Sequence, residues 1–285
     1  MLTILLDGIS YGMLLFVLAC GLSVTLGLMN FVNLAHGAFA LVGGYAATVL
    51  TNRYGVPFLL CLPIAFVVAG AVGIVLERLL YRRLYGRTHL EQVLFSIGLV
   101  FMTVAATDHV MGSSQQYIRL PAFLDGRVEF LGAGISVYRL FVGVICGLIA
   151  VGLQAFLIGT RFGSRLRAAV DDPRVAAGLG IDVDRVFAVT FGVGCGLAGL
   201  GGALGGNLLG MDPNFPLKFL ISFLIVVTVG GTTGIWGAFF AALLLGIADV
   251  AGKYYVPSVG AFIIYAVMVA VLIVRPQGLF ARAGR

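Results

Sequence analysis

The segment Arg161–Arg185, RFGSRLRAAVDDPRVAAGLGIDVDR, is a charged island in an otherwise apolar chain, and it shows how the rest of the chain must be arranged. This charged island holds nine of the 30 charged side chains, whereas segments 140–160 and 186–211 on either side hold none. Even on the most lenient insertion scale, a charge at the centre of a bilayer costs roughly 2.5–3.5 kcal/mol. The charged island is therefore predicted to lie outside a membrane that its neighbours cross, where a water-soluble partner can dock.

The composition supports an integral membrane protein. Hydrophobic residues make up 60% of the 285 residues and charged residues only 11%, against about 25% charged residues in soluble domains. The 41 glycines fit helices that approach one another closely inside a membrane. We therefore expect an all-α fold, a polytopic bundle of transmembrane helices, and a soluble alternative has no support.

Net charge and cysteine usage exclude further classes of function. The formal charge of +6 is explained by arginines on the cytoplasmic side of a membrane, so it implies no nucleic-acid partner. The cysteines are scattered through apolar segments without a CxxC spacing, which predicts buried free thiols and neither a metal nor another cofactor. They are Cys20, Cys61, Cys146 and Cys195.

Segments without Asp, Glu, Lys or Arg predict the membrane passes, because one pass needs roughly 20 apolar residues. The first such segment is long enough for two passes, and 219–248 can hold one pass plus a half-span, broken at Gly230–Gly234. We expect eight or nine membrane helices with short discontinuous half-helices, in a single domain of residues 1–285. The segments are 8–52, 54–76, 92–107, 140–160, 186–211, 219–248 and 254–274.

The placement of arginines predicts the orientation of the chain. Loop 77–91, the charged island and the tail from Arg275 are rich in arginine, and we place them in the cytoplasm. Loop 108–139 balances three arginines against three acidic residues and is placed outside. This alternation puts the N-terminus outside and the C-terminus inside.

Polar side chains are rare within the apolar segments, and three of them gather in MNFVNLAHG (29–37). Asn30, Asn33 and His36 are candidates to line a substrate pathway, because amide and imidazole groups donate to and accept from a zwitterionic or amide-bearing solute. Asn33 and His36, three residues apart, would share one face of a helix. A structural role, in which these groups cap a broken helix or bind it to a neighbour, is the alternative and is compatible with the first.

A short sequence similarity relates this block to a second one and suggests an internal repeat. The sequence His36–Phe39 (HGAF) resembles Trp236–Phe239 (WGAF), and each follows a polar, non-helical break, the second at Gly230–Gly234. Paired breaks in the two halves of a chain indicate the midplane pathway of a transporter. Chance similarity is the alternative in so glycine-rich a sequence.

The remaining polar groups have simpler interpretations. Asp249 and Lys253, four residues apart, are predicted to form an ion pair near the outer surface rather than a proton-coupling site. Asn207–Asn214 is predicted to include a capped external turn. The sequence contains no triad pattern, no HExxH and no phosphate-binding GxxxxGK[ST] loop, so it is not predicted to be an enzyme. Uphill transport would need energy from a partner or an ion gradient.

Five blocks of the sequence, in this order, carry a family resemblance. They are MNFVNLAHGAFALVGGY (29–45), LERLLYRRL (76–84), DDPRVAAGLGIDVDRVFAVTF (171–191), GGTTGIWGAFFAALLLGIAD (230–249) and RPQGLF (275–280). Together they resemble the permeases of branched-chain amino-acid ABC importers, specifically the shorter of the two permease subunits. The resemblance covers nearly the whole chain.

The resemblance implies a subunit of a larger transporter in the bacterial inner membrane. Its partners would be a second, homologous permease in a heterodimer, two cytoplasmic ABC ATPase subunits and a periplasmic solute-binding protein. The complex would import branched-chain or other hydrophobic amino acids by ATP-driven alternating access, with ATP hydrolysed by the partners and not by this chain.

The resemblance also implies that residues 160–185 form a cytoplasmic coupling loop, whose short helix inserts into the ATPase. The local chemistry agrees, since Pro173 suits the first turn of a helix after an Asp172 N-cap. Alanines favour the helix that follows, and Gly178 or Gly180 can end it. The residues that match the coupling motif are Asp171, Asp172, Pro173, Ala176, Ala177, Gly178, Gly180 and Ile181.

One departure leaves the solute open. The family commonly has Asn-Phe where this chain has Asn33-Leu34, and a different residue there suggests a different solute. The same kind of permease is used for urea and short amides and for aromatic or aliphatic carboxylates. The sequence also leaves open a passive amide- or urea-type channel, a sugar permease of a related ABC family and an intramembrane enzyme. In a passive channel, however, the charged island is unexplained.

Overall fold

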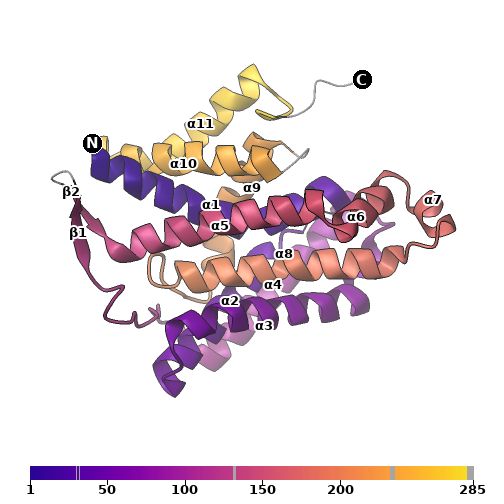
Figure 1. The fold of residues 1–285 in the computed structure, drawn as a ribbon, viewed down its shortest axis with the longest axis horizontal. Helices are drawn as coiled ribbons and strands as arrows, with labels where there is room; N and C mark the ends of the chain where they lie inside the picture. Colours follow the sequence, from indigo (N-terminus) through magenta and orange to yellow (C-terminus); the bar gives the residue numbers. More distant parts are fainter. Residues whose placement is uncertain (30, 32, 131–132, 232–234, 281–285) are drawn as a thin grey trace.

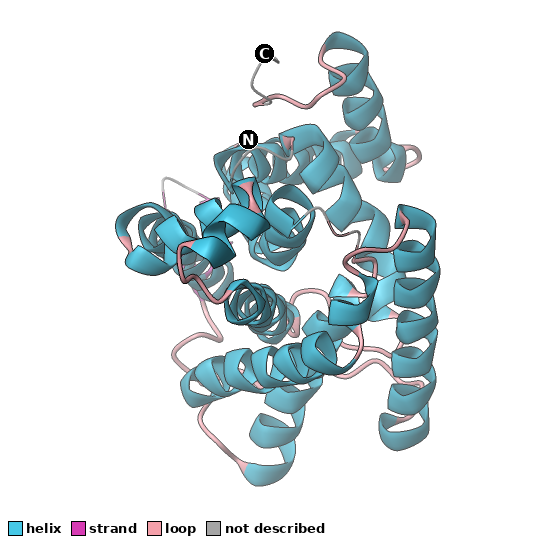
Figure 2. Ribbon diagram, turned by 90° about the vertical axis from the view of Figure 1, so that its right-hand side faces the viewer, coloured by secondary structure: helices cyan, strands magenta, loops and turns pink. Residues whose placement is uncertain are grey.

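The computed structural model describes the whole chain except residues 30, 32, 131–132, 232–234 and 281–285. The described residues fold into helices and one small antiparallel hairpin (Figures 1 and 2), which confirms the all-α bundle. In chain order the elements are α1 (Leu2–Met29), α2 (His36–Tyr54), α3 (Phe58–Leu79), the 3-10 helix η1 (Tyr81–Leu84), α4 (His89–Met111), β1 (Arg127–Phe130), β2 (Ala133–Ser136), α5 (Val137–Gly159), α6 (Arg161–Asp171), α7 (Pro173–Gly178), α8 (Val183–Gly205), α9 (Phe215–Gly230), α10 (Ile235–Tyr255) and α11 (Gly260–Val274).

Among the described residues, six helices are long and apolar enough to cross a membrane, namely α1, α3, α4, α5, α8 and α10. The expected count of eight or nine helices is wrong, because the described residues form eleven α-helices. The apolar segments divide as expected, with α9 and α11 as short helices of 16 and 15 residues, so the difference lies in the charged segment. The charged island, expected mainly as a loop, adds α6 and α7.

Both predicted helix breaks are present. α1 ends at Met29 and α2 begins at His36, so the first apolar segment does divide into two helices. α9 ends at Gly230, where the second break was predicted, and α10 begins at Ile235, while residues 232–234 of that break lie outside the described residues. The short helix of this pair is α9, and α10 supplies the full-length pass.

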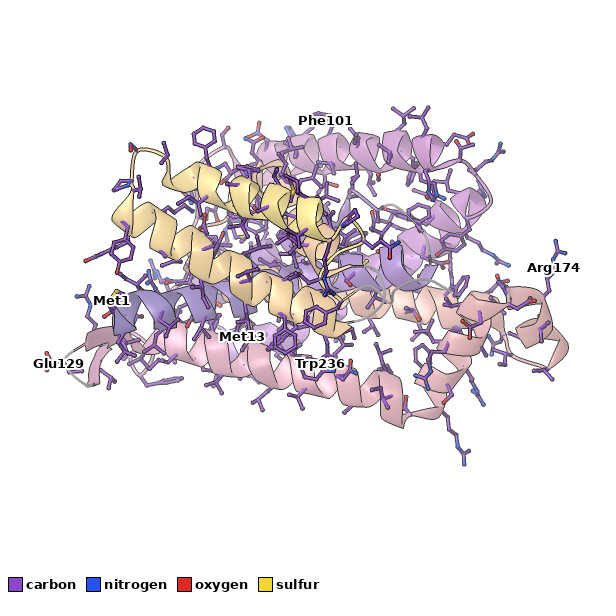
Figure 3. The ribbon with its side chains drawn as sticks, turned by 90° about the horizontal axis from the view of Figure 1, so that it is seen from above. Met1, Met13, Phe101, Glu129, Arg174 and Trp236 are labelled. Atoms are coloured by element: carbon purple, nitrogen blue, oxygen red, sulfur yellow. The ribbon has the colours of Figure 1, made fainter. Side chains whose placement is uncertain are left out.

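The bundle has two distinct ends. Met1 and Glu129 of strand β1 lie at one end, which we call the Met1 end (Figures 1 and 3). Arg174 of α7 lies at the opposite end, the α7 end (Figure 3). An ion pair between Arg82 and Asp184 joins η1 to the start of α8 at the α7 end. The two arginine-rich loops 77–91 and 161–185 therefore share one end, as expected, while loop 108–139 lies at the other (Figure 1).

α1 and α8 form the centre of the bundle, and glycines set their contacts. A Cβ on Gly43 of α2 would overlap the Cα of Gly199 of α8. A Cβ on Gly246 of α10 would overlap the backbone of Gly12 of α1. Because these helices touch backbone to backbone, the glycines act as predicted, as sites of close approach between membrane helices. The four cysteines are also buried free thiols, as expected.

Candidate functional site

The break between α1 and α2 is held by Asn33, whose side chain is fully buried. Its Oδ1 accepts hydrogen bonds from the backbone N–H of Ala35 at 3.1 Å and from the hydroxyl of Tyr81 at 3.0 Å. The first bond supports the turn that precedes α2, and the second ties this turn to η1. Asn33 therefore joins two segments that are 48 residues apart. Asn30, the first of the three predicted pathway residues, lies outside the described residues.

His36 begins α2 and faces α1. Its Nε2 lies 2.8 Å from the carbonyl oxygen of Leu18, so Nε2 carries the proton and donates it. A Cβ on Gly21 would lie 2.6 Å from the Cε1 atom of His36, which shows how closely the ring approaches α1. The ring of Phe223 from α9 meets the imidazole edge to face at 6.4 Å. His36 thus binds α2 to α1 and α9.

Two polar atoms at this break have no hydrogen-bond partner in the described structure, although both are buried. They are the Nδ2 of Asn33 and the Nδ1 of His36. A buried polar group without a partner costs about 1–3 kcal/mol, and such groups are rare in folded proteins. Because Nε2 of His36 is the donor to Leu18, Nδ1 is an acceptor, while Nδ2 of Asn33 is a donor. The break therefore offers one free donor and one free acceptor.

Tyr45, two turns along α2, also carries a buried hydroxyl without a hydrogen-bond partner in the described structure. It lines an open pocket of about 430 Å³ between α2 and α4. The other lining residues are mostly apolar, and they include Leu41, Leu99 and Met111. This pocket lies along the same helix as His36 but is built almost entirely from hydrocarbon.

Tyr81 connects the break with the α7 end of the bundle. Its ring is fully buried and packs against Phe31, Phe95 and Phe191 at centroid distances of 5.3, 5.2 and 4.6 Å. Burial raises the pKa of Tyr81 well above its usual value, so the hydroxyl stays a neutral donor to Asn33. Its neighbour Arg82 forms the ion pair with Asp184. A chain of contacts therefore runs from the first turn of α8 to the α1–α2 break.

The charged island forms α6 and α7, and its second helix has the predicted cap. The carboxylate of Asp172 accepts from the backbone N–H groups of Arg174 and Val175 at 2.9 and 3.0 Å, with Pro173 in the first turn. The helix ends at Gly178, and Gly180 follows with a φ of +84°, a conformation that suits glycine. Both features confirm the expected start and end of this helix.

α7 has a buried side and an exposed side. Ala176 is buried in a small apolar cluster with Leu166, Ala169 and Val186, separate from the main core. On the other side Ala177 is exposed, and Val175 and Leu179 are 58% and 77% exposed. The small cluster holds α7 firmly while an apolar surface faces outward. The remaining motif residues, Asp171 and Ile181, flank this helix.

The predicted site residues therefore form two groups and not one. Asn33 and His36 lie together at the α1–α2 break, and the charged island lies at the α7 end (Figure 1). Sequence reasoning missed Tyr81, which connects the first group with that end. The available signal was Tyr81 and Tyr85, spaced four apart within an arginine-rich loop, which predicts two aromatic rings on one face.

The six described helices that are long and apolar enough to cross a membrane place the chain in the class of multi-pass membrane proteins. The family model described as "branched-chain amino acid transport system / permease component" matches residues 4–272. The chain therefore belongs to this family of permeases, as the sequence blocks indicated. It is a multi-pass membrane protein of the permease kind and not of the ATPase kind.

Individual relatives agree along the whole length. The high-affinity branched-chain amino acid transport system permease protein BraD of Pseudomonas aeruginosa is 28% identical, over 98% of this chain and 95% of the relative. The probable branched-chain amino acid transport permease protein LivH of Methanocaldococcus jannaschii is 29% identical, over 97% and 91%. The permease protein LivM of Escherichia coli is 26% identical over 94% of this chain but 68% of its own length. The chain thus resembles the shorter kind of permease. No solved structure matches it significantly.

Proposed function

We propose that this chain is the shorter permease subunit of an ABC importer in a bacterial inner membrane, and that it translocates branched-chain or other hydrophobic amino acids. The observation that carries the proposal is the full-length family match together with the capped, outward-facing helix α7. Residues 1–285 would act as one transmembrane domain. A passive channel has no use for a docking helix built in this way.

The proposed partners follow from the family of the chain and from its sequence, which contains no phosphate-binding loop for ATP. BraD, LivH and LivM are named as permeases of amino-acid transport systems, and LivM differs in length from the other two. We infer a heterodimer with a LivM-like permease, two ABC ATPases at the α7 end, and a periplasmic solute-binding protein at the Met1 end. ATP would be hydrolysed by the ATPase partners.

The charged island would couple ATP hydrolysis to transport. Its α7 helix is short, capped and anchored on its own apolar cluster, so it resists bending when a partner pushes on it. Val175 and Leu179, four residues apart, present exposed apolar side chains on one side of the helix, and the small exposed side chain of Ala177 lies on another, so the helix would fit an apolar cleft on the ATPase. A push would pass to the first turn of α8, from Asp184 to Arg82, and through Tyr81 to Asn33.

The passage would open at the break between α1 and α2. Asn33 accepts two hydrogen bonds and His36 donates one, and each keeps one unpaired polar atom, so they combine the structural and the pathway roles. A solute amino or carboxylate group passing the break can hydrogen-bond to these atoms. Asn30 is proposed for the same lining from its position in the sequence.

The proposal is tested by uptake into proteoliposomes that hold this permease with its neighbouring permease, ATPase and binding-protein gene products. Radiolabelled leucine, urea and an aromatic carboxylate are compared, each with and without ATP inside the vesicles. We expect uptake of leucine that depends on ATP.

Each other outcome rejects a defined part of the proposal. ATP-dependent uptake of urea or the carboxylate alone would keep the importer and reject the amino acid. Uptake that is indifferent to ATP would reject the importer in favour of a passive channel.

A further inference from the structure

A second feature, away from the α1–α2 break, lies at the Met1 end of the bundle. A pocket of about 520 Å³ opens there between α1, α5, α9 and α10. Its volume falls within the range of roughly 300–1,000 Å³ that is usual for small-molecule sites. Apolar walls come from Tyr11, Leu209 and Phe219. The polar lining consists mainly of two ion pairs.

The first ion pair joins two residues of α10. The Nζ of Lys253 lies 2.6 Å from Oδ2 of Asp249, which confirms the predicted i,i+4 pair. The Asp249 side chain is 7% exposed and that of Lys253 is 56% exposed. Lys253 also lies over the ring of Tyr11, with Nζ 5.9 Å from the ring centroid. The carboxylate of Asp249 is therefore buried within the helix bundle, while more than half of the Lys253 side chain is exposed.

The second ion pair joins Arg139, near the start of α5, to Asp7 of α1. Here too the acid is the more buried partner, since the Asp7 side chain is 20% exposed and that of Arg139 is 42% exposed. Two acids and two bases from three helices thus line one pocket. A buried ionisable group within a membrane bundle indicates a functional site, because such a group is costly to keep there.

The helix crossing beneath the pocket fixes the acids relative to one another. Cβ atoms on Gly8 and Gly12 of α1 would lie 2.7 Å from the Cα of Ile247 and from the carbonyl oxygen of Ala242 in α10. Contact this close leaves α1 and α10 no room to move nearer to each other. Asp7 lies on α1 and Asp249 on α10, so this close contact fixes the backbone positions of the two acids. The long side chains of Arg139 and Lys253 can still change rotamer.

We propose that this pocket is an outer recognition site for a zwitterionic amino acid, an inference that rests on the proposed importer function. The solute's ammonium group would take the place of Lys253 or Arg139 on an aspartate, and its carboxylate would bind the base so released. Tyr11 and Phe219 would contact an aliphatic side chain. Only a solute with both charges replaces every ionic contact that it breaks, because a monocarboxylate leaves an aspartate unpaired and urea leaves both partners unpaired.

A series of contacts between aromatic rings links the wall of the pocket with the break. Phe219 lines the pocket and stacks on Phe223, with centroids 6.3 Å apart and planes inclined by 22°. Phe223 in turn meets the ring of His36. The outer site therefore adjoins the helix α9 that leads to the proposed passage.

The test measures solute binding without the solute-binding protein. The complex of both permeases and the ATPases is placed in lipid nanodiscs, and L-leucine binding is followed by saturation-transfer NMR, which detects weak ligands. We expect Asp249→Asn and Lys253→Gln each to weaken leucine binding roughly tenfold, since each removes one charge-assisted contact. The matched control is Lys218→Gln, because Lys218 pairs with buried Asp212 at 2.5 Å outside this pocket.

Competition by two analogues tests the requirement for both charges. Leucinamide lacks the carboxylate and 4-methylpentanoate lacks the ammonium group, so neither is expected to displace leucine at equal concentration. If Asp249→Asn does not give monodisperse protein, Lys253→Gln decides, because Lys253 is half exposed and the amide of a glutamine still donates a hydrogen bond to Asp249.

Three results would overturn the inference, namely no leucine signal with the wild type, unchanged binding in folded Lys253→Gln, or equal competition by an analogue. Uptake with ATP is measured separately in proteoliposomes made from the same purified complex together with the solute-binding protein, because nanodiscs have no interior. If the wild type does not take up leucine in preference to urea and the carboxylate, the importer proposal is rejected. The proposal of a recognition site in the pocket is decided by the NMR comparison alone.

Discussion

Replacing Tyr81 with phenylalanine isolates the contact that connects the α7 end with the α1–α2 break. The substitution keeps the ring, and with it the packing against Phe31, Phe95 and Phe191. It removes only the hydroxyl, which donates to Oδ1 of Asn33 at 3.0 Å. Asn33 retains its bond from the backbone of Ala35. The turn before α2 therefore still forms, but it is no longer tied to η1.

The size of the effect follows from one buried hydrogen bond. Such a bond contributes about 1 kcal/mol net, which is a factor of about five in an equilibrium between two arrangements. If the ATPases drive the break through Tyr81, the variant loses that bias. We therefore expect the complete transporter that carries Tyr81→Phe to hydrolyse ATP at the normal rate and to import about fivefold less leucine for each ATP hydrolysed.

The assay is leucine uptake and phosphate release measured on the same proteoliposomes. Tyr138→Phe is the matched control, because the hydroxyl of Tyr138 donates to the carbonyl oxygen of Leu204 at 2.6 Å, between α5 and α8. It loses a buried hydrogen bond of the same kind at a place that does not contact the break. The reasoning is refuted if the two variants show the same leucine-to-ATP ratio.

Three further substitutions test the charged island and the core. Ala177→Arg, on the exposed side of α7, should leave a monodisperse protein whose ATP hydrolysis no longer drives uptake, and normal uptake would contradict the coupling role. Asp172→Ala removes the acceptor for two backbone N–H groups and should destabilise α7 by about 1 kcal/mol, lowering uptake, while Asp172→Asn should preserve uptake. Gly199→Ala puts a Cβ 2.9 Å from the carbonyl oxygen of Ala65 and should lower the yield of folded protein, as judged by gel filtration. Gly152→Ala, which meets nothing within 4 Å, should not lower it.

Charge distribution predicted the passes beside the charged island well, because a charged group marks where a chain leaves the hydrocarbon. The segment 140–160 became α5 (Val137–Gly159), and the segment 186–211 became α8 (Val183–Gly205). The total count of helices was wrong for a physical reason. Charge-free runs give the apolar helices and the break at Gly230, but a charged segment does not reveal how many short helices it forms outside the membrane, and α6 and α7 account for the difference.

The candidate site was predictable only where its signal is local. Asn33 and His36 stand out because polar side chains are rare in apolar segments, and the Asp172 cap stands out because its partners are two and three residues away. Tyr81 was not predictable in the same way, since its partner Asn33 is 48 residues distant. Composition predicts that a buried tyrosine will find an acceptor, but it does not predict which one.

α8 is the element best placed to carry motion from the charged island into the bundle. It begins directly after the Asp182 cap, and its glycines face α1, α2 and α3, where Cβ atoms on Gly194 and Gly70 would lie 3.3 and 3.1 Å from the backbones of Gly21 and Gly192. Contacts between backbones have few interlocking side chains, so a helix can shift along its axis without changing many rotamers. A Cβ on Gly21 would also overlap the ring of His36. Under the proposed mechanism, the glycine contacts therefore allow α8 to shift against its neighbours as far as the passage at the α1–α2 break. This role would account for the many glycines in the chain.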